Sequence, residues 1–336
     1  MILLKTFDNK FDFSVFESKA RSDQLQGTDM EKLAECAGRI CYDSFGTGRS
    51  SKDWHEHVLN VKHLSIYEHC WFWIEDLGYS DEELNIEHLS SGGIRFAYKK
   101  KSDPEPEPTL DPEPIIEFNA RFALEHRYDF MLPVLEAYMP NVLKAARSAK
   151  LPISDRVIPT YEVGSFGLSD NWATLLLDMS RGCSHEIVRH GDNTAISQRS
   201  TRYVDESKYE SEGLSSCSSN CVLIPPFLTD DFEITPTLAK NINSILEDNF
   251  RSCMENYLKL KQLFKEHNEN NLSRTFTTKV VNGLARLVLP HNLRTEMVFS
   301  AEREQWKHMI NMRTSPGADQ EIRRLFFEIQ KVLDLY

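Results

Sequence analysis

Long apolar runs are absent from this sequence of 336 residues, in which no stretch approaches the ~20 consecutive apolar residues of a membrane-spanning helix. Residues 1–8 begin apolar but offer neither the basic start nor the full apolar core of a secretory signal. Hydrophobic residues make up 40% of the chain and charged residues 27%, the usual composition of a globular protein with a sizeable core. We therefore expect a cytoplasmic protein that has no membrane partner.

Positive charge is also scarce, with 39 basic residues against 51 acidic ones and a net charge of −12. Broad binding to nucleic acid depends on a basic surface, so we expect no nucleic-acid partner. A phosphorylated small molecule is still compatible with this balance, because a few arginines that converge locally are enough to hold a phosphate.

Cysteines are few, and their spacing indicates neither a disulfide framework nor a metal site. Seven in a long chain is an odd number, which favours reduced thiols. Cys217 and Cys221 are spaced C-x3-C without a second pair nearby, so we expect no zinc and no other bound metal. Cys70 and Cys183 stand among apolar residues and are interpreted as structural.

Apolar periodicity predicts strands and helices that interleave without a regular βαβ rhythm, which favours an α+β fold. Short apolar or aromatic runs predict strands at the N-terminus and over residues 70–74, 94–98 and 172–179. Apolar residues at three- and four-residue steps predict helices over residues 30–41, 51–63, 115–149, 237–267, 301–312 and 318–335. The apolar stripe of the longest one indicates core or a subunit interface rather than a cofactor site.

Residues 102–114, SDPEPEPTLDPEP, contain five prolines and five acidic residues. Proline removes backbone hydrogen-bond donors and the acidic side chains repel each other, so the segment predicts an extended loop in solvent. It is interpreted as a tether without chemistry of its own.

The densest group of functional residue types lies in residues 180–203, directly after the last predicted strand. Six arginines or histidines and six serines or threonines fall within these 24 residues. The pattern predicts a short helix that ends at His190 and is stopped by Gly191 as a left-handed residue. On such a helix Glu186 shares one face with Arg189 and His190.

Hydroxyl, amide and guanidinium groups continue in the segment that follows, which is interpreted as a loop. These residues are Ser197, Gln198, Arg199, Ser200 and Arg202. Guanidinium forks and hydroxyls that converge in this way suit a phosphate. The alternative is a solvated surface, which is the better interpretation of any single arginine; the density of the whole segment favours a binding site.

Metal chemistry is a second alternative, because residues 185–190, His-Glu-Ile-Val-Arg-His, come close to the zinc motif H-E-x-x-H. The match fails by one residue. The position four residues after His185 is Arg189, so His190 leaves the shared helix face that zinc ligation needs. A zinc hydrolase is therefore not favoured.

Three blocks of residues follow one another in a recognisable order. His63-Leu-Ser65-Ile-Tyr-Glu68-His69-Cys-Trp-Phe72 is similar to the pattern H-x-[ST]-x-x-E-H-x-x-F, and residues 180–203 to S-R-x-x-x-H-[EQ]-x-V, then R-H-R, a spacer and S-x-R-Y. Residues 285–323 are similar to A-R-x-x-L-P, T, N-A-R, H-F, L-R and A-Q-x-E-I-R in that order. Together the blocks resemble the flavin-dependent thymidylate synthases, over about residues 30–75 and 172–335.

The resemblance implies a central mixed or antiparallel sheet flanked by helices in a single domain of residues 1–336, with residues 76–171 as an elaboration that diverges from the family. It implies FAD as cofactor, dUMP or a related pyrimidine deoxynucleotide as substrate, NADPH and methylenetetrahydrofolate as co-substrates, and a homotetramer. Reduced FAD would pass a methylene from the folate to C5 of the pyrimidine and complete the methyl with a hydride. No cysteine nucleophile is needed, because the cofactor carries the chemistry.

Roles for individual residues also follow from the resemblance. Arg189, His190 and Arg313 would be catalytic, and Arg313 would lie against the uracil, where a guanidinium stabilises negative charge that builds on the ring. The nucleotide would be bound by Glu186, Gln198, Ser200, Thr201, Arg202, Arg286 and Arg313. FAD would be bound by His63, Ser65, Glu68, Arg189, His190, Arg303 and His308.

The chain departs from the family pattern at several positions. Gly191 replaces the second arginine of R-H-R, and the spacer after it is one residue longer. Gln198 stands where many members have glutamate, Gly317 where histidine is frequent, and Glu302 where N-A-R begins. Two alternatives to thymidylate synthesis therefore stay open: a variant pyrimidine nucleotide hydroxymethylase, and a non-catalytic nucleotide-binding homologue.

Overall fold

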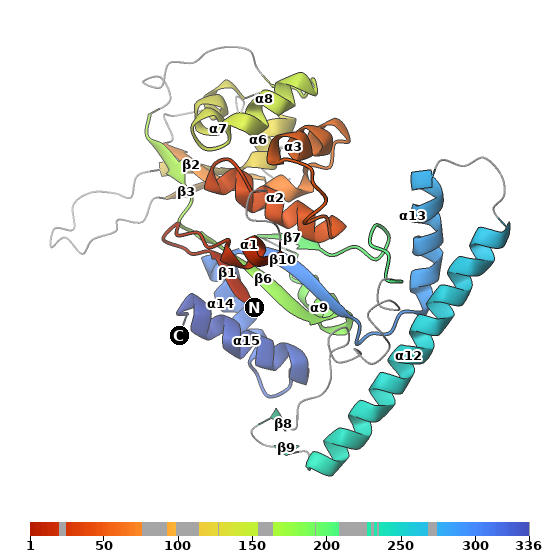
Figure 1. Ribbon diagram of the computed structural model, residues 1–336. Coiled ribbons are helices and arrows are strands. Elements are labelled where there is room, and N and C mark those ends of the chain that lie inside the picture. Colours follow the sequence, from red (N-terminus) through yellow and green to blue (C-terminus); the bar gives the residue numbers. More distant parts are fainter. Residues whose placement is uncertain are drawn as a thin grey trace.

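Two four-stranded antiparallel sheets, each covered by helices, form the body of the molecule (Figure 1). The computed structural model describes residues 1–19, 25–75, 93–98, 114–126, 128–153, 164–191, 193–207, 227–229, 232–233, 235–267 and 274–335. Strand pairing within both sheets is antiparallel throughout these residues. The predicted α+β fold, with antiparallel sheet flanked by helices, is confirmed.

The first sheet has the order β1-β6-β10-β7. Its strands are β1 (Ile2–Lys5), β6 (Trp172–Ser180), β7 (Thr194–Gln198) and β10 (Arg294–Glu302). The two central strands β6 and β10 pair from Ser180 opposite Arg294 to Trp172 opposite Glu302. Because almost every residue of β6 is buried, its sequence is a continuous apolar run rather than an alternating one.

The two faces of this sheet pack into different cores. Leu175 and Leu177 of β6 lie under α14 (Arg303–Arg313) and α15 (Gln320–Leu333) in one buried cluster. Leu176 lies between them in sequence and packs into a larger cluster on the opposite face, as the two-residue repeat of a strand requires. The first sheet is therefore the layer that the two cores share.

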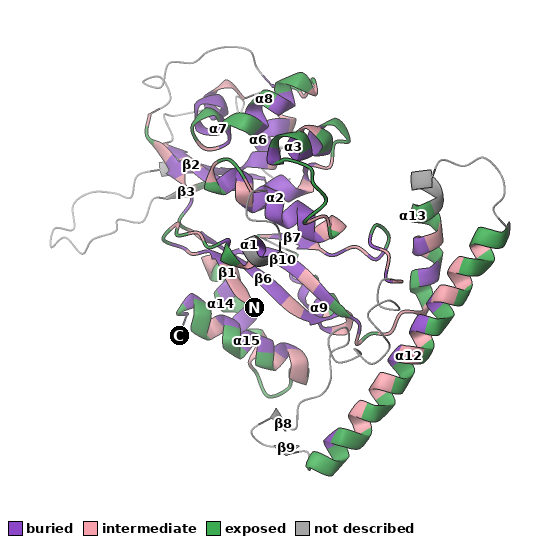
Figure 2. Ribbon diagram, viewed as in Figure 1, coloured by how far each residue is buried: buried purple, intermediate pink, exposed green. Residues whose placement is uncertain are grey.

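The second sheet has the order β3-β4-β2-β5. Its strands are β2 (Trp71–Glu75), β3 (Ile94–Tyr98), β4 (Pro114–Asn119) and β5 (Phe166–Leu168). The larger core joins it to α2 (Asp29–Tyr42), α3 (Ser51–Asn60), α6 (Ala120–Glu125), α7 (Leu132–Tyr138) and α8 (Pro140–Ser148). In Figure 2 the inner faces of these elements are buried and their outer faces are exposed. Residues of the predicted elaboration thus complete this sheet.

Shorter elements connect these layers. They are α1 (Ser14–Lys19), η1 (Leu64–His69), η2 (Asp129–Met131), α9 (Arg181–Ile187), η5 (Arg286–Val288), β8 (Phe227–Thr229) and β9 (Phe232–Glu233). One of them carries a link between the sheets. His69 at the end of η1 contacts Ser300 Oγ on β10 at 2.7 Å and Ser197 Oγ on β7 at 2.9 Å.

A helical arm stands away from the body (Figure 1). It consists of α12 (Pro236–His267) with α13 (Arg274–Ala285) packed beside it. The 32 residues of α12 span about 48 Å at 1.5 Å per residue. Large apolar side chains on the arm are exposed, among them Ile245 at 68% and Leu263 at 52%. The arm thus carries more apolar surface than its own small cluster covers.

Several predictions about elements were wrong in detail. The helix predicted to begin at residue 115 is preceded by strand β4, and α6 begins only at Ala120. The helix after β6 ends at Ile187, and Gly191 does not have the predicted left-handed conformation; Asn193 does, at φ 49°. Ser197 and Gln198 lie on β7 rather than in a loop.

Other expectations fall partly outside the part of the chain that the structure describes. Residues 102–113 of the acidic proline-rich segment lie outside it, as do Cys217 and Cys221. The five cysteines inside it, Cys36, Cys41, Cys70, Cys183 and Cys253, are free thiols. Among the described helices, none combines the length and the apolar character needed to cross a membrane.

Candidate active site

The turn from β6 into α9 sets the position of the first candidate residues. Ser180 caps α9 by accepting a hydrogen bond from the Cys183 amide at 3.0 Å, which satisfies one free donor of the helix start. Its own hydroxyl and amide donate to Glu321 of α15. The short helix is therefore fixed at its start, and it carries Glu186 on its last turn.

Arg313, Glu186 and His190 form one cluster, although Arg313 is far from the other two in the chain. Arg313 at the end of α14 donates from Nε to His190 Nε2 at 2.9 Å. It also donates to Glu186 Oε2 and to the Glu186 carbonyl, both at 3.1 Å. These three contacts hold the plane of the guanidinium in one orientation.

His190 is nearly buried, at 9% exposed, and carries no proton on Nε2 in this arrangement because that atom accepts from Arg313. Burial lowers the pKa of His190, and the neighbouring side chains of Arg313, His308 and Arg189 lower it further, against the opposite effect of Glu186. His308 lies edge-on to it, with ring centroids 6.4 Å apart. We therefore expect a neutral His190 at pH 7.

Arg189 and Arg303, assigned by the resemblance to FAD, have different surroundings. Arg189 is exposed and pairs with Glu186 at 3.3 Å. Arg303 begins α14, and its guanidinium carbon lies 3.9 Å from the ring centroid of Phe7. Phe7 belongs to the core under the first sheet, so Arg303 has a packing role in addition to any ligand role.

Gln198 lies on β7 and faces α9. Its amide donates to Ser184 Oγ at 2.7 Å, and the same nitrogen lies 3.4 Å from Thr295 Oγ1 on β10. Ser184 in turn donates to the Arg181 carbonyl at 2.8 Å. The side chain that the resemblance directs toward the sugar is thus anchored beside the start of α9.

The turn after β7 holds the residues implied for the phosphate. Ser200 receives the Arg202 amide on its hydroxyl at 3.2 Å and donates its own amide to the Cys41 carbonyl at 3.0 Å. Thr201 is buried, whereas Arg202 is exposed. The guanidinium of Arg202 is therefore available to an anion at the surface.

More positive charge gathers beside this turn. Arg181 at the start of α9 donates to the Arg199 carbonyl at 3.1 Å and is half-buried. Burial lowers its pKa, and the cations of Arg199 and Arg286 lower it further, against the opposite effect of Glu206. Arg286 on η5 is exposed. Several guanidinium groups thus approach one place, where an anion would relieve their repulsion.

Arg199 has a different function from the phosphate contact suggested by its neighbours. It is 6% exposed and makes two parallel hydrogen bonds to the buried Glu206, at 2.8 and 3.0 Å, with Asp43 at 3.5 Å. A buried arginine in a two-pronged pair with a carboxylate holds structure together. It positions the turn that presents Arg202.

His63 lies beside the same turn through a chain of aromatic rings. Its Nδ1 contacts the Tyr42 hydroxyl at 2.6 Å, and the Tyr42 ring meets Tyr203 edge-on at 4.9 Å between centroids. Lys279 of the arm donates to the Tyr203 hydroxyl at 2.8 Å. Ser65, on η1 close to His63, is half-buried.

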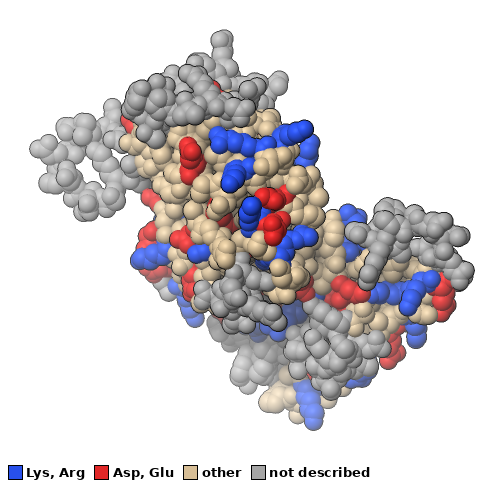
Figure 3. Space-filling model, turned by 45° about the horizontal axis from the view of Figure 1, so that its top comes forward, with Lys and Arg blue, Asp and Glu red and all other residues tan. Residues whose placement is uncertain are grey.

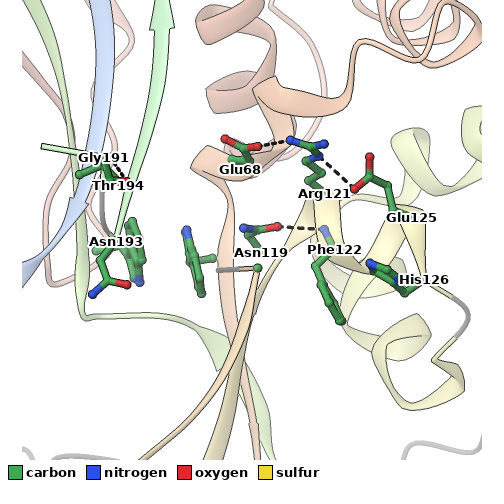
Figure 4. A pocket seen from close by; sticks show the side chains of 12 residues that line it. Glu68, Asn119, Arg121, Phe122, Glu125, His126, Gly191, Asn193 and Thr194 are labelled. Atoms are coloured by element: carbon green, nitrogen blue, oxygen red, sulfur yellow. Dashed lines mark hydrogen bonds and ion pairs between the residues drawn. The ribbon is translucent and has the colours of Figure 1, made fainter. Parts of the chain in front are cut away.

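A polar pocket of about 250 Å³ opens between α6 and the segment that follows α9 (Figure 4). Of the sequence candidates it contains Glu68, whose pKa is raised by burial against the opposite effect of Arg121. The pocket is lined by Glu68, Trp71, Gly93, Asn119, Arg121, Phe122, Glu125, His126, Trp172, Gly191, Asn193 and Thr194. Arg121 is not among the residues predicted from the sequence, because a charged residue on a short helix belongs to no recognisable motif.

Within the described ranges, no group of three or more histidine, cysteine, aspartate or glutamate side chains is arranged to hold a metal ion. Figure 3 shows one face of the molecule, on which basic and acidic side chains lie close to each other.

Comparison with known proteins gives consistent matches. Residues 171–334 match the family described as thymidylate synthase complementing protein. The flavin-dependent thymidylate synthase of Mycobacterium marinum (strain ATCC BAA-535 / M) is 32% identical over 174 residues, which are 51% of this chain and 62% of that protein. That of Mycobacterium avium (strain 104) is 31% identical over 169 residues, 50% of this chain and 60% of that protein. The chain thus spans about three fifths of the length of these curated relatives.

A solved structure is also similar in part. It is thymidylate synthase X from Helicobacter pylori with FAD and dUMP, at 18% identity. The alignment covers 48% of this chain and 67% of that one, with a TM-score of 0.32.

Proposed function

We propose that this chain, which belongs to the thymidylate synthase complementing protein family over residues 171–334, is an FAD-dependent enzyme that transfers a one-carbon unit to C5 of dUMP to make dTMP. The observation that carries the proposal is the convergence of Arg313, Glu186 and His190 near the end of α9, whose first residue, Arg181, donates to the turn that follows β7. The relatives named as flavin-dependent thymidylate synthases support the same reaction. NADPH and methylenetetrahydrofolate are the proposed co-substrates.

Phosphate binding is assigned to the turn after β7 and to η5. Arg202 and Arg286 are exposed and can approach a dianion from two elements. Ser200 and Thr201 add hydroxyl groups between them, and Gln198 would reach the sugar from β7. Charge-assisted hydrogen bonds of this kind are about twice as strong as neutral ones. The base is assigned to the cluster around Arg313.

Arg313 would act on the uracil ring. Three of its five N–H donors are used by Glu186 and His190 within the described residues, which leaves two for a ligand. A guanidinium that is already oriented stabilises charge developing at a ring oxygen without reorganising during the reaction. Neutral His190 keeps the guanidinium in place, and Glu186 balances its charge.

The flavin is assigned to the side of the site that faces η1 and α6. The proposed contacts are His63, Ser65, Glu68, Arg189, His190, Arg303 and His308. The residues fit a planar ring at one point above all: a Cβ added to Gly191 would meet nothing within 4 Å, so the wall of the pocket is open there. When bound, FAD supplies hydride transfer, which no side chain can perform.

The open wall at Gly191 also favours a second reaction. An arginine at this position would exclude water from the pocket, whereas glycine leaves the space accessible. Water could then capture the one-carbon unit before hydride transfer is complete, and a hydroxymethyl pyrimidine nucleotide would be the product. This variant reaction uses the same nucleotide contacts.

We further propose a homotetramer. The support is exposed apolar surface on the arm and on the adjoining η5, where Ile245, Leu263 and Leu284 of the arm and Leu287 of η5 are at least 39% exposed. Apolar patches of this kind mark association surfaces in many proteins. Sedimentation at micromolar concentration checks the proposal, and a species of monomer size alone would contradict it.

One assay tests the reaction. The purified full chain is incubated with dUMP, methylenetetrahydrofolate, FAD and NADPH, and the nucleotide product is identified by mass spectrometry. We expect dTMP. A hydroxymethyl product would establish the variant reaction instead, and normal binding of dUMP without any product would leave a non-catalytic nucleotide-binding protein.

A further inference from the structure

The start of α6 directs Arg121 into the pocket shown in Figure 4. Asn119 caps this helix by accepting the Phe122 amide at 2.9 Å, so the helix begins immediately after strand β4. Arg121 occupies the first turn. Its Nε donates to Glu125 at 3.0 Å, and its Nη1 pairs with Glu68 of η1.

Arg121 therefore forms ion pairs with two carboxylates and is not a solvated surface charge. The side chain of Arg121 is 39% exposed, that of Glu68 28% and that of Glu125 36%. Two of the five guanidinium N–H donors are used in these pairs, and each carboxylate keeps a second oxygen. The wall thus presents donors and acceptors side by side at fixed positions.

The opposite wall is backbone and small side chains. Thr194 donates its hydroxyl to the carbonyls of His190 and Gly191, both at 3.0 Å, and so fixes the segment between α9 and β7. Asn193 lines the pocket from the left-handed conformation, and Gly191 presents no side chain. This wall leaves room for a ligand in front of Arg121.

An aromatic surface separates the two walls. Trp71 and Trp172 are stacked, with ring centroids 4.1 Å apart and planes 7° from parallel. Both line the pocket, together with Phe122 and His126. Trp71, Trp172 and Phe122 are almost fully buried, at 3%, 1% and 2% exposed, so they form a rigid base for the pocket and leave its polar groups to contact a ligand.

The size of the pocket restricts the ligand. Small-molecule sites usually measure about 300–1,000 Å³, and this one measures about 250 Å³. It can take one ring system but not a whole dinucleotide. A pyrimidinone ring presents N–H and C=O groups alternately along one edge, which matches carboxylate oxygens beside guanidinium N–H groups.

We propose that this pocket binds the pyrimidinone edge of a planar nitrogen heterocycle, with Arg121 donating to a ring carbonyl and Glu68 accepting from a ring N–H. Arg121 is then a positioning residue that the elaboration of residues 76–171 contributes to the site. The inference rests on the proposed function, because that reaction uses two molecules with such a ring besides the nucleotide, the flavin and the folate. The experiment below distinguishes between them.

Affinities for FAD, methylenetetrahydrofolate and dUMP are measured separately, by flavin fluorescence and by calorimetry, for the full chain and for Arg121→Gln. We expect Arg121→Gln to weaken binding of FAD or of the folate by about 10- to 100-fold, the effect of losing one charged hydrogen bond. Binding of dUMP should stay within about twofold. The matched control is Arg251→Gln, because Arg251 is 42% exposed and pairs with Asp248 on the distant α12; it should change no affinity.

A second variant separates ligand contact from folding. Gly191→Arg adds a guanidinium to the same pocket from the opposite wall, so in the Arg121→Gln background it should restore at least part of the lost affinity. A purely structural role for Arg121 would show no such rescue. The ligand that is weakened and rescued identifies the ring that occupies the pocket.

The outcomes also separate the inference from the proposed function. If the unmodified chain binds neither FAD nor dUMP, the proposed function fails. If the unmodified chain binds them and Arg121→Gln changes no affinity, or weakens dUMP as much as the other ligands, the inference alone is overturned.

Discussion

The two sheets of this molecule have the same size and the same antiparallel pairing, but they carry the family pattern unequally. The first sheet, β1-β6-β10-β7, lies mostly within the matched residues 171–334. The second, β3-β4-β2-β5, lies outside them. The nucleotide-side candidates come from the first sheet and its helices, whereas Glu68 and Arg121 come from elements packed on the second. The candidate site thus lies mostly in residues that resemble the family, and Arg121 is the addition that comes from the elaboration.

A contact between the sheets explains one departure from that pattern. Glu302, where the family has N-A-R, pairs with Arg95 of β3 at 2.5 Å and accepts from Asn171 at 2.9 Å. Arg95 also pairs with the buried Glu117 of β4 and lies over Trp71 and Trp172 at 5.7 and 5.9 Å. Glu302 therefore fits a partner that exists only in the divergent sheet. The departure at Glu302 and the divergent residues that form β3 and β4 therefore belong together.

Breaking this contact should give the largest effect. Arg95→Ala leaves the carboxylate of Glu117 buried without its cation, which we expect to cost about 3–5 kcal/mol of unfolding free energy. Urea denaturation followed by circular dichroism measures it. The control Arg294→Ala removes an exposed pair with Asp178 at the other end of β10 and should cost at most about 1 kcal/mol. Equal losses for both would mean that the sheets do not depend on Arg95.

The nucleotide side can be tested within the first region alone. Arg202→Ala should weaken dUMP binding by about 1.5–3 kcal/mol, because its exposed guanidinium is assigned to the phosphate. FAD binding should change much less. Calorimetric titration of each ligand checks this, with Arg251→Ala as the control. Equal losses for dUMP and FAD would contradict the division of the site into two sides.

His69 tests the link between the regions through pH. Burial lowers its pKa from the ordinary 6.5 to about 3. Below pH 6.5 the folded protein therefore binds fewer protons than the unfolded chain. The contribution of neutral His69 to the free energy of unfolding is complete above pH 6.5 and is lost as the pH falls toward 3. At pH 5 the loss should be about 2 kcal/mol. His69→Asn removes this part of the pH dependence; denaturation series at pH 7.5 and 5 with an unchanged difference would contradict the assignment.

Much of the fold follows from local pattern. The continuous apolar run of β6 and the periodicity of α2 and α12 predict those elements correctly, within a few residues at their ends. The strand that begins after residue 113 does not follow from local pattern, because Ile115, Ile116 and Phe118 fit a helix stripe as well as a buried strand. Pairing with β2 and β3 decides in favour of the strand, and this pairing is tertiary context that local pattern lacks.

The site was predictable only in part, for a related reason. Spacing alone brings Glu186 near His190, but Arg313 lies 123 residues further along the chain. Its place in the cluster followed from the resemblance and not from periodicity. Neither periodicity nor the resemblance indicated Arg121, since its position depends on how α6 packs against η1. Gly191 was expected to be the left-handed residue after the helix, and Asn193 has that conformation instead, at φ 49°.

Arg189 should give the smallest effect, and it separates surface charge from ligand contact. Its side chain is 70% exposed and forms an ion pair with Glu186 at 3.3 Å. Arg313 pairs with the same carboxylate at the shorter distance of 3.1 Å. Arg189→Ala should therefore change the unfolding free energy by less than about 0.5 kcal/mol.

An exposed guanidinium at the rim can still bind an anion, so FAD affinity should fall by about three- to tenfold in Arg189→Ala while dUMP affinity stays the same. Thermal denaturation without ligand and flavin fluorescence titration measure the two effects independently. A loss of FAD affinity without a loss of stability places Arg189 on the flavin side together with Arg121. If neither quantity changes, Arg189 is a solvated charge, and the flavin side depends on the divergent sheet to a greater extent than the family pattern implies.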